Sequence, residues 1–352
     1  MNAHQPHDLK QLQSLPLEAK IRLTKRRIEV WYESWSKYEI FNTKTKKTRF
    51  ITWDSRYPNS EPHLKDSEII QSITPGAVYV SFSGGKDSTV LKHIVDSMYD
   101  DVPSVFVDTG LEYPEVRMFA RERAEVVLRP EMRFDDVIKN YGYPVVSKEL
   151  AQKIEETRSK PDGYASQSFD PNSPKIQKYG SRYDLSKWKY LLDAPFKISN
   201  KCCRVMKKRP AEKYEKETGR KPIVGSMASE SGARKTVWQR YGCNAFGKRR
   251  PVSNPLSFWT EQDVLEYIRR YNLEYASVYG DIVETPKGLA TTGCTRTGCM
   301  FCLFGCTQDG TPNRFQRMKE THPRQYDYCM RPVEEKGLGL REVLDYIGVP
   351  YE

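Results

Sequence analysis

The chain of 352 residues predicts an α/β fold built on a parallel β-sheet. Two apolar runs of strand type, 77–82 and 104–107, flank a helix-compatible stretch at about 88–100. A strand–helix–strand unit of this spacing places both strands parallel in one sheet, with ligands at their carboxyl ends. Two further short apolar runs, 126–128 and 223–227, are expected to add strands.

A glycine turn joins the first strand to the following helix. Two glycines allow close approach of a ligand to the backbone, and the new helix offers free N–H groups to an anion. Lys86 adds a positive charge, whereas the carboxylate of Asp87 repels phosphate unless a cation such as Mg²⁺ lies between them. The turn therefore predicts a site for ATP with Mg²⁺. Its candidate nucleotide-binding residues are Ser83, Gly84, Gly85, Lys86, Asp87 and Ser88.

Two other interpretations of this turn were weighed. The Walker A pattern requires a glycine where Val80 stands and a Ser or Thr where Asp87 follows Lys86, so it does not fit. A tight strand-to-helix turn without a ligand is the simpler alternative, and it stays open.

Composition bounds the class of protein. Lys and Arg number 57 against 46 Asp and Glu, a formal net charge of +11. A basic surplus favours nucleotides, nucleic acid or an acidic protein as partners, and a merely solubilising charge is the alternative. No apolar run approaches the ~20 residues of a membrane span, and the first residues lack a secretory signal pattern. We therefore expect a cytoplasmic protein that does not enter a membrane.

The remaining segments give a coarse organisation. The first dozen residues are expected to be loose, and 15–38 is expected to be a helix. The basic, aromatic stretch 40–53 is β-prone; it could contact nucleic acid or pack on the core as a small subdomain. We expect three parts: an N-terminal basic extension (1–65), an α/β nucleotide-binding domain (66–290), and a cysteine-rich cluster-binding and C-terminal segment (291–352).

Later segments read mainly as helices. Residues 134–141, 147–157 and 260–271 have helical patterns, and Thr260 is the expected N-cap of the last. The polar stretch 158–190 is expected to be a mobile loop or lid.

All eight cysteines lie in the second half of the chain, from Cys202 onward. Cys299 and Cys302 form a C-x2-C turn, which places two thiolates on one metal or cluster, and a second pair would complete four ligands. A structural zinc site and free thiols are alternatives. The spacing Cys294-x4-Cys299-x2-Cys302 also matches plant-type [2Fe–2S] ferredoxins.

Two motifs carry a resemblance to a known family. Ser-Gly-Gly-x-Asp-Ser at 83–88 resembles the PP-loop of the ATP pyrophosphatase superfamily. Val-Phe-Val-Asp-Thr-Gly-Leu-Glu-Tyr-Pro at 105–114 resembles its sulfonucleotide reductase branch and the related enzymes of DNA phosphorothioation. The resemblance covers roughly residues 70–305. It implies a doubly wound parallel sheet of the adenine nucleotide alpha hydrolase type; members that use ATP cleave it between the α and β phosphates.

The resemblance also implies site residues. The tandem Cys202-Cys203 segment is similar to that of adenylylsulfate reductases, in which the tandem pair and a later C-x2-C hold one [4Fe–4S] cluster. A set with Cys294 in place of Cys202 stays open. The segment 225–234 resembles one whose arginine faces phosphate or sulfate. The implied ligands are Cys202, Cys203, Cys299 and Cys302 for the cluster, and Asp108, Glu230, Ser231 and Arg234 for the nucleotide.

One departure shapes the functional expectation. Sulfonucleotide reductases use a cysteine in a Glu-Cys-Gly-Leu-His type motif, which the last residues of this sequence do not contain, and Cys329 has other neighbours. We therefore expect an ATP pyrophosphatase that adenylylates a substrate for sulfur incorporation, with DNA phosphorothioation preferred and a cysteine desulfurase as sulfur donor. Lys86, Asp87, Asp108 and Arg234 are the expected catalytic residues. Cys306 is a candidate persulfide carrier or reactive thiol.

Two alternatives remain from the sequence. One is a true adenylylsulfate or phosphoadenylylsulfate reductase. The other is a noncatalytic nucleotide-sensing subunit of a nucleic-acid-modifying complex. The acceptor of sulfur and a homo-oligomeric state are left open.

Overall fold

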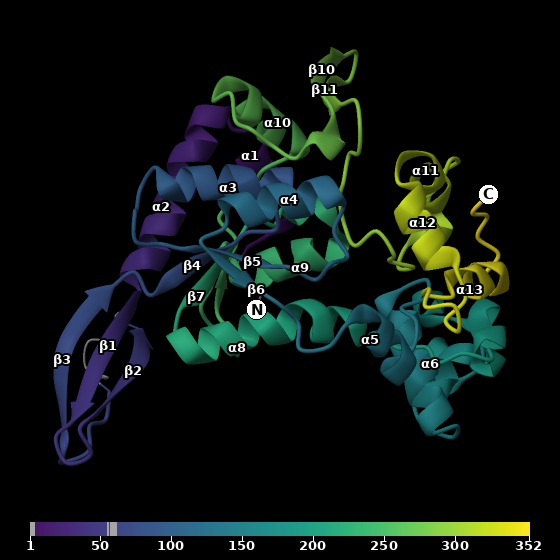
Figure 1. Ribbon diagram of the computed structural model, residues 1–352, viewed down its shortest axis with the longest axis horizontal. Coiled ribbons are helices and arrows are strands. Elements are labelled where there is room, and N and C mark those ends of the chain that lie inside the picture. Colours follow the sequence, from purple (N-terminus) through teal and green to yellow (C-terminus); the bar gives the residue numbers. More distant parts are fainter. Residues whose placement is uncertain (1–3, 55, 57–61) are drawn as a thin grey trace. The chain divides into compact units, whose positions relative to one another are not determined.

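The computed structural model describes residues 4–54, 56 and 62–352. The chain divides into two compact units (Figure 1). Unit 1 comprises residues 1–128 and 211–297, and unit 2 comprises residues 129–210 and 298–352. The three parts expected from the sequence stay a prediction. Within the described ranges, no helix is both long and apolar enough to cross a membrane.

A six-stranded sheet forms the centre of unit 1, in the order β6-β5-β4-β7-β9-β8. Five strands are parallel, and β8 pairs antiparallel with β9. Along the chain, strands are added first on one side of β4 and then, from β7, on its other side. This order confirms the predicted doubly wound α/β fold. The strands are β4 (Val78–Ser81), β5 (Ser104–Val107), β6 (Val126–Leu128), β7 (Lys221–Val224), β8 (Asn244–Ala245) and β9 (Val252–Ser253).

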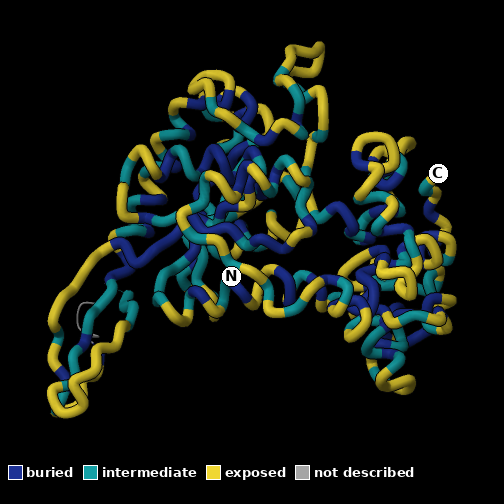
Figure 2. The backbone as a smooth tube through the Cα atoms, viewed as in Figure 1, coloured by how far each residue is buried: buried dark blue, intermediate teal, exposed yellow. Residues whose placement is uncertain are grey.

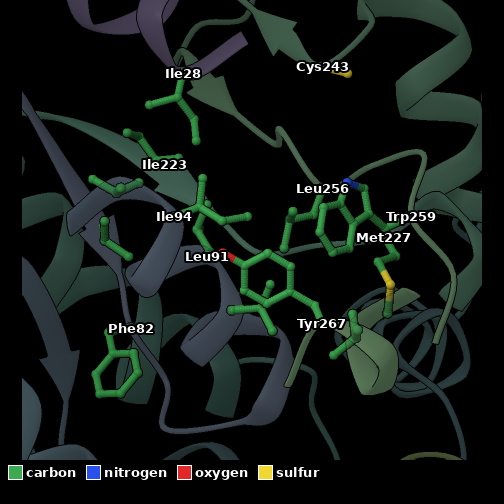
Figure 3. Close-up of a cluster of buried hydrophobic side chains, with 14 of the residues drawn as sticks. Ile28, Phe82, Leu91, Ile94, Ile223, Met227, Cys243, Leu256, Trp259 and Tyr267 are labelled. Atoms are coloured by element: carbon green, nitrogen blue, oxygen red, sulfur yellow. The ribbon is translucent and has the colours of Figure 1, made fainter. Parts of the chain in front are cut away.

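Helices cover both faces of this sheet. Val78 and Val80 alternate with Tyr79 along β4, so they join a different hydrophobic cluster. The larger cluster includes Leu91 and other residues of α3, and Figure 3 shows its side chains converging. On the other face, Tyr79 packs against Tyr214 of α8. The helices are α2 (Leu17–Glu33), α3 (Lys86–Asp96), α4 (Pro114–Arg123), α8 (Arg209–Thr218), α9 (Gly232–Tyr241) and α10 (Glu261–Arg270).

Helix α10 begins as the sequence predicts. The Thr260 side chain accepts from the Asp263 backbone N–H, and the Asp263 carboxylate accepts from the Thr260 backbone N–H (2.6 Å). The same carboxylate binds the ammonium of Lys20 from α2, at 2.7 and 2.8 Å. Lys20 is buried, so its charge is neutralised inside the core. A hairpin of β10 (Ile282–Thr285) and β11 (Gly288–Thr291) follows this helix.

The N-terminal region contains more order than its sequence predicts. Residues expected to be loose form α1 (Pro6–Gln13), and α2 ends at Glu33 because the aromatic stretch after it enters a sheet. Strand β1 pairs antiparallel with β2 and with β3. Figure 2 shows exposed residues along β2 and β3. These strands are β1 (Trp35–Asn42), β2 (Lys47–Asp54) and β3 (Glu68–Pro75).

Unit 2 is mainly helical, and one prediction there is wrong. The stretch 158–190 is not a loop but a series of short helices with buried Phe169 and Ile176. Arg158 anchors the chain that follows, because its guanidinium donates to four backbone carbonyls between Leu191 and Phe196. These contacts satisfy polar groups that would otherwise favour solvent.

The elements of unit 2 are α5 (Phe134–Tyr141), α6 (Lys148–Ser159), η1 (Ser166–Phe169), α7 (Pro174–Tyr179), η2 (Ser181–Tyr183), η3 (Ser186–Asp193), the π-helical turn η4 (Arg204–Lys208), η7 (Cys306–Gln308), α11 (Arg314–Thr321), α12 (Pro323–Met330) and α13 (Leu340–Tyr346).

Candidate functional site

The glycine turn lies between β4 and α3, where the sheet order reverses. In doubly wound sheets, ligands bind beyond the carboxyl ends of the strands at this switch point. Ser88 Oγ accepts from the Ser83 backbone N–H (3.2 Å) and donates to the Gly85 carbonyl (2.8 Å), which closes the turn. Helix α3 starts at Lys86, so its first free N–H groups face the turn.

Gly84 is required at its position for two reasons. Its φ of 74° is in the left-handed region, which favours glycine. A Cβ there would also lie 2.7 Å from the Val116 carbonyl oxygen and 2.8 Å from the Ala120 Cβ. Helix α4 therefore packs directly on the turn, and no side chain larger than hydrogen fits.

Lys86 is buried beside the turn, with only 3% of its surface exposed. Its ammonium donates to the Thr295 carbonyl (2.8 Å) and lies 3.2 Å from a carboxylate oxygen of Glu261 and 3.9 Å from Asp87 Oδ1. The ring of Tyr279 lies below it, 5.4 Å from centroid to nitrogen. These contacts hold a positive charge at a fixed place at the edge of the sheet.

Asp87 provides the least satisfied polar atom of the turn. Its Oδ1 is buried and has no hydrogen-bond partner. Burial raises the pKa of this carboxyl, although Lys86, Arg296 and Arg234 act in the opposite direction. A desolvated carboxylate oxygen that faces cations and lacks a donor has the chemistry of a ligand for a hard metal ion.

The segment after β7 meets the glycine turn. A Cβ on Gly225 would lie 3.0 Å from the Asp87 carbonyl oxygen, so the two segments are in contact. Farther along, Glu230 forms ion pairs with Arg234 and with Arg296 (3.0 Å for the latter). Burial and the neighbouring Arg296 both lower the pKa of Arg234, whereas Asp87 raises it. Two arginines and a lysine thus act electrostatically on the Asp87 carboxylate.

Ser231 and Asp108 are already engaged by the protein. Ser231 is the N-cap of α9, and its Oγ accepts from the Arg234 backbone N–H (3.3 Å). Asp108 follows β5 and binds the Arg117 guanidinium through both oxygens (2.6 and 3.0 Å). Arg121 lies 3.8 Å from the same carboxylate. The Asp108 carboxylate therefore already has an arginine partner. Its direct contact with ribose or metal stays a prediction.

Four of the cysteines gather in unit 2. A hydrogen bond with Cys203 and burial raise the pKa of Cys202, and the charges of Cys203, Cys299 and Cys302 act in the same direction. That hydrogen bond lowers the pKa of Cys203 to about 5, and Lys148 is the largest of the cations acting in the same direction. The four thiols predicted as ligands therefore lie within electrostatic reach of one another.

The geometry of these thiols is not that of a formed metal centre. Among the described residues, no group of three or more His, Cys, Asp or Glu side chains is arranged to hold a metal ion. Arg314 orders the turn that carries Cys302, because it donates to the Cys302 carbonyl (2.9 Å) and to Phe304 (3.0 Å) while it pairs with Asp309. The donor set fits a thiolate-ligated cluster in its chemistry, and the ligand assignment stays a prediction.

The other cysteines differ in environment. Cys306 is buried, and burial raises its pKa to about 12 despite the nearby Arg314. Burial therefore favours the protonated thiol, and the role of Cys306 as a persulfide carrier or reactive thiol stays a prediction. Cys294 belongs to unit 1, whereas Cys202 belongs to unit 2.

Comparison with known proteins decides the family. A model of the phosphoadenosine phosphosulfate reductase domain matches residues 77–304, which is more than half of the chain. The chain belongs to this family. The match begins at the first residues of β4 and ends two residues after Cys302, so it includes both the glycine turn and the four gathered thiols.

Two individual proteins are also similar to this chain. An uncharacterised protein of Methanocaldococcus jannaschii is 23% identical over 280 residues, which is 76% of this chain and 50% of that protein. Sulfate adenylyltransferase subunit 2 of Streptomyces lavendulae is 28% identical over 214 residues, or 57% of this chain and 55% of that protein. The chain thus spans about half the length of these relatives.

A solved structure gives a weaker likeness. The phosphoadenylyl-sulfate reductase of Candida auris, in a phosphate complex, is 16% identical, with a TM-score of 0.33 over 57% of this chain and 75% of that one. This likeness is too weak to add to the family match, and the membership of the chain in the phosphoadenosine phosphosulfate reductase domain family does not depend on it.

The structure brings most of the predicted nucleotide residues of this family member to one edge of the sheet. Lys86, Asp87, Glu230 and Arg234 interact with one another or through shared partners. The sequence alone does not predict Arg296, Glu261 or Tyr279 as part of the site. Arg296 is the only Lys or Arg between Gly288 and Cys302, so no basic pattern in the sequence indicates it.

Proposed function

We propose that unit 1 binds ATP with Mg²⁺ at the turn formed by residues 83–88 and transfers the adenylyl group to an oxygen of an acceptor. The observation that supports this most directly is the buried Oδ1 of Asp87, which has no hydrogen-bond partner and lies 3.9 Å from the Lys86 ammonium. A carboxylate at this place would repel a bare polyphosphate, and a bound cation removes the repulsion. Membership in a family named for a sulfonucleotide enzyme supports the nucleotide class.

The proposed first step is a displacement at the α phosphorus. The acceptor oxygen forms a bond to that phosphorus, the bond to the bridging oxygen breaks, and its electron pair leaves with pyrophosphate. The developing charge is on the pyrophosphate oxygens. In this proposal Lys86 and Arg234 stabilise that charge, and the backbone N–H groups of Gly84 and Gly85 bind it.

The metal would be held by Asp87. Mg²⁺, when bound there, would screen the charge of the phosphates and polarise the bond that breaks. Burial is the largest effect on the pKa of this carboxyl and raises it, and the protein's own contribution is the charge of Lys86, Arg296 and Arg234, which opposes that effect.

The proposed second step introduces sulfur. The terminal sulfur of a persulfide from a cysteine desulfurase forms a bond to the activated acceptor atom, and AMP leaves with the electron pair. A second thiol then takes the donor sulfur as a disulfide and leaves the acceptor with a single sulfur atom. We propose nucleic acid as the acceptor class and DNA backbone phosphorothioation as the pathway, because the chain carries a surplus of 11 positive charges.

We infer that Cys202, Cys203, Cys299 and Cys302 hold a [4Fe–4S] cluster. Support comes from the mutual effects of these thiols on their pKa values and from the cations at Cys203, which favour thiolate. A structural zinc ion is the inorganic alternative.

A reductase of sulfonucleotides is the second candidate, and the family match favours it. Parallel assays separate the two. The proposal expects pyrophosphate from ATP and no sulfite from adenylylsulfate or its 3′-phosphate with a thiol donor. Lys86→Ala should lower pyrophosphate release about 100-fold, whereas the exposed Lys216→Ala should leave it unchanged. Sulfite without pyrophosphate would establish the reductase, and neither product would indicate a nucleotide sensor.

A further inference from the structure

The stretch of short helices in unit 2 between Lys160 and Tyr190 exposes an unusual number of aromatic rings. Tyr164, Tyr179 and Tyr190 are 57%, 51% and 41% exposed. Among the described residues, only one tyrosine outside this stretch, Tyr271, is comparably exposed. Large exposed rings gathered in one short segment are a feature of interaction surfaces.

The same stretch carries cations that lie over its rings. Lys178 lies 5.2 Å from the ring of Tyr179, Arg182 lies 4.9 Å from that of Tyr183, and Lys187 lies 5.3 Å from that of Trp188. The rings of Tyr179 and Tyr183 are themselves 6.1 Å apart. Each of these three rings therefore has a positive charge beside it.

These cations are not consumed by ion pairs within the protein. In the part of the chain that the structure describes, Lys178, Arg182 and Lys187 approach no carboxylate within 4 Å. The stretch 160–190 contains six Lys and Arg residues against three Asp residues. One of the acids, Asp184, is engaged by the backbone N–H of Ser186 (2.8 Å). The surface is thus positive and open.

The scaffold of this surface is ordered. Ser173 caps α7 by accepting from the Ile176 backbone N–H, and Phe169, Ile176 and Leu191 are buried beneath it. Arg158 fixes the end of η3 through its bonds to backbone carbonyls. The rings therefore lie on packed helices, and this packing fixes their spacing.

Rings with neighbouring cations match the chemistry of an unpaired nucleic acid strand. Bases whose faces are free stack on aromatic side chains, and Lys or Arg beside each ring binds the adjacent phosphate. In a duplex the base faces are already stacked, so exposed tyrosines gain little there. An acidic peptide would use the charges but not the row of rings.

We propose that the surface formed by residues 160–190 binds single-stranded nucleic acid, with Tyr179 and Tyr164 as stacking platforms and Lys178, Arg182 and Lys187 as phosphate contacts. The role of this surface, which is to hold the acceptor strand, rests on the proposed function, in which nucleic acid is the acceptor. The binding itself requires neither ATP nor the glycine turn.

The test is fluorescence anisotropy of a labelled 20-nucleotide strand with the full chain, without nucleotide, across a range of salt concentrations. Tyr179→Ala should weaken binding about tenfold, while Tyr179→Phe, which keeps the ring, should bind like the wild type. The double variant Lys178→Ala/Arg182→Ala should reduce the slope of log K against log salt by about 1.4. Lys216→Ala in unit 1 is the matched control and should leave the slope unchanged. Near-identical circular dichroism and Tm values confirm that the variants fold.

Several results would overturn the proposal. They are equal affinity of wild type and Tyr179→Ala, tighter binding of the duplex than of the single strand, and preference for anionic vesicles or an acidic peptide over the strand. DNA and RNA strands of one sequence are compared in the same assay, and binding of either supports the surface. Pyrophosphate release is measured separately. If the protein binds the strand but releases no pyrophosphate, the proposed surface stands and the ATP proposal is refuted. If it releases pyrophosphate but does not bind the strand, the ATP proposal stands and the proposed surface is refuted.

Discussion

At the scale of single residues, Asp87 lowers the stability of the fold and is proposed to bind the metal, and substitution separates the two effects. Its Oδ1 is buried without a donor, and burial raises the pKa of the carboxyl. An acid whose pKa is raised by folding destabilises the folded state above that pKa. The destabilisation disappears as the pH falls below the pKa of the same carboxyl in the unfolded chain, because this group is then protonated in both states. A buried charge that costs stability is typical of a group kept for function.

Asp87→Asn is therefore expected to stabilise the protein in the absence of metal and nucleotide. We expect Tm at pH 7.5 with EDTA to rise by ~2 °C, and the gain over wild type to shrink as the pH is lowered toward 4. With ATP and Mg²⁺ the order should reverse, since only the wild type gains stability from the metal-bound ligand.

The control for this substitution is Asp66→Asn, which changes an exposed carboxylate in the same unit and should leave Tm unaltered at every pH. Differential scanning fluorimetry across the pH range is sufficient. A variant that melts below the wild type in EDTA would show that the Asp87 carboxylate stabilises the turn, contrary to this account.

At the scale of secondary-structure elements, the glycine turn depends on the packing of α4. Gly84 and Gly110 have nearly the same φ, 74° and 73°, but a Cβ on Gly110 would meet nothing within 4 Å. Gly110→Ala should therefore lower the free energy of unfolding by only about 1–2 kcal/mol, which is the cost of a left-handed backbone conformation for alanine. Gly84→Ala should cost at least ~2 kcal/mol more, because the new methyl meets the Val116 carbonyl.

Urea denaturation of both variants measures the difference. Equal losses of unfolding free energy would show that α4 moves aside without cost, and the close packing of turn and helix would then not be a determinant of the site.

A second element-scale prediction concerns the contact of α2 with α10. Asp263→Ala removes the only carboxylate bound to the buried ammonium of Lys20 within the described residues and also removes the bond from the Thr260 backbone N–H to the Asp263 carboxylate. We expect the free energy of unfolding to fall by about 3–5 kcal/mol. Lys20→Met is the matched partner variant; it should cost less, since Asp263 keeps its two bonds from Thr260. A loss below about 1 kcal/mol for Asp263→Ala in urea denaturation would refute the importance of this pair.

The elements differ in how well the sequence predicts them. Strands β5 and β6 and helix α5 have the predicted bounds, because the two strands are short apolar runs and the helix has a local pattern that ends before Gly142. Helix α10 follows from the cap at Thr260. The helices of 158–190 did not follow, because Arg158 and buried Phe169 stabilise them through contacts distant in sequence. The adjacency of β4 and β7 is likewise non-local, and it is what brings Arg234 to the glycine turn.

The site shows the same division between local and non-local information. The turn 83–88 is a contiguous motif and could be found from sequence, and Arg234 was reached through resemblance. Arg296 and Glu261 enter the site only because α10 and the segment after β11 return to the end of β4. No periodicity or spacing in the sequence reports such a return.

At the scale of the whole molecule, the two units are expected to depend on different cofactors. Protein purified without oxygen from iron-supplied cells should contain about four iron atoms and four sulfides per chain, with the optical and paramagnetic spectra of a [4Fe–4S] cluster. Cys203→Ser should lose most of the iron. Cys243→Ser, a buried cysteine in unit 1, is the control and should retain it. A sample that holds only zinc would contradict the iron–sulfur assignment.

The central claim for the molecule is that ATP is cleaved between its α and β phosphates. Two analogues test it directly, because one has a carbon bridge between the β and γ phosphorus atoms and the other between α and β. In the presence of Mg²⁺ and acceptor, we predict by ³¹P NMR that β,γ-methylene-ATP yields AMP, or an adenylylated acceptor, together with methylenediphosphonate, while α,β-methylene-ATP is bound but not cleaved at that bridge. Cleavage of the α,β-methylene analogue to release phosphate, with the β,γ-methylene analogue left intact, would contradict the claim.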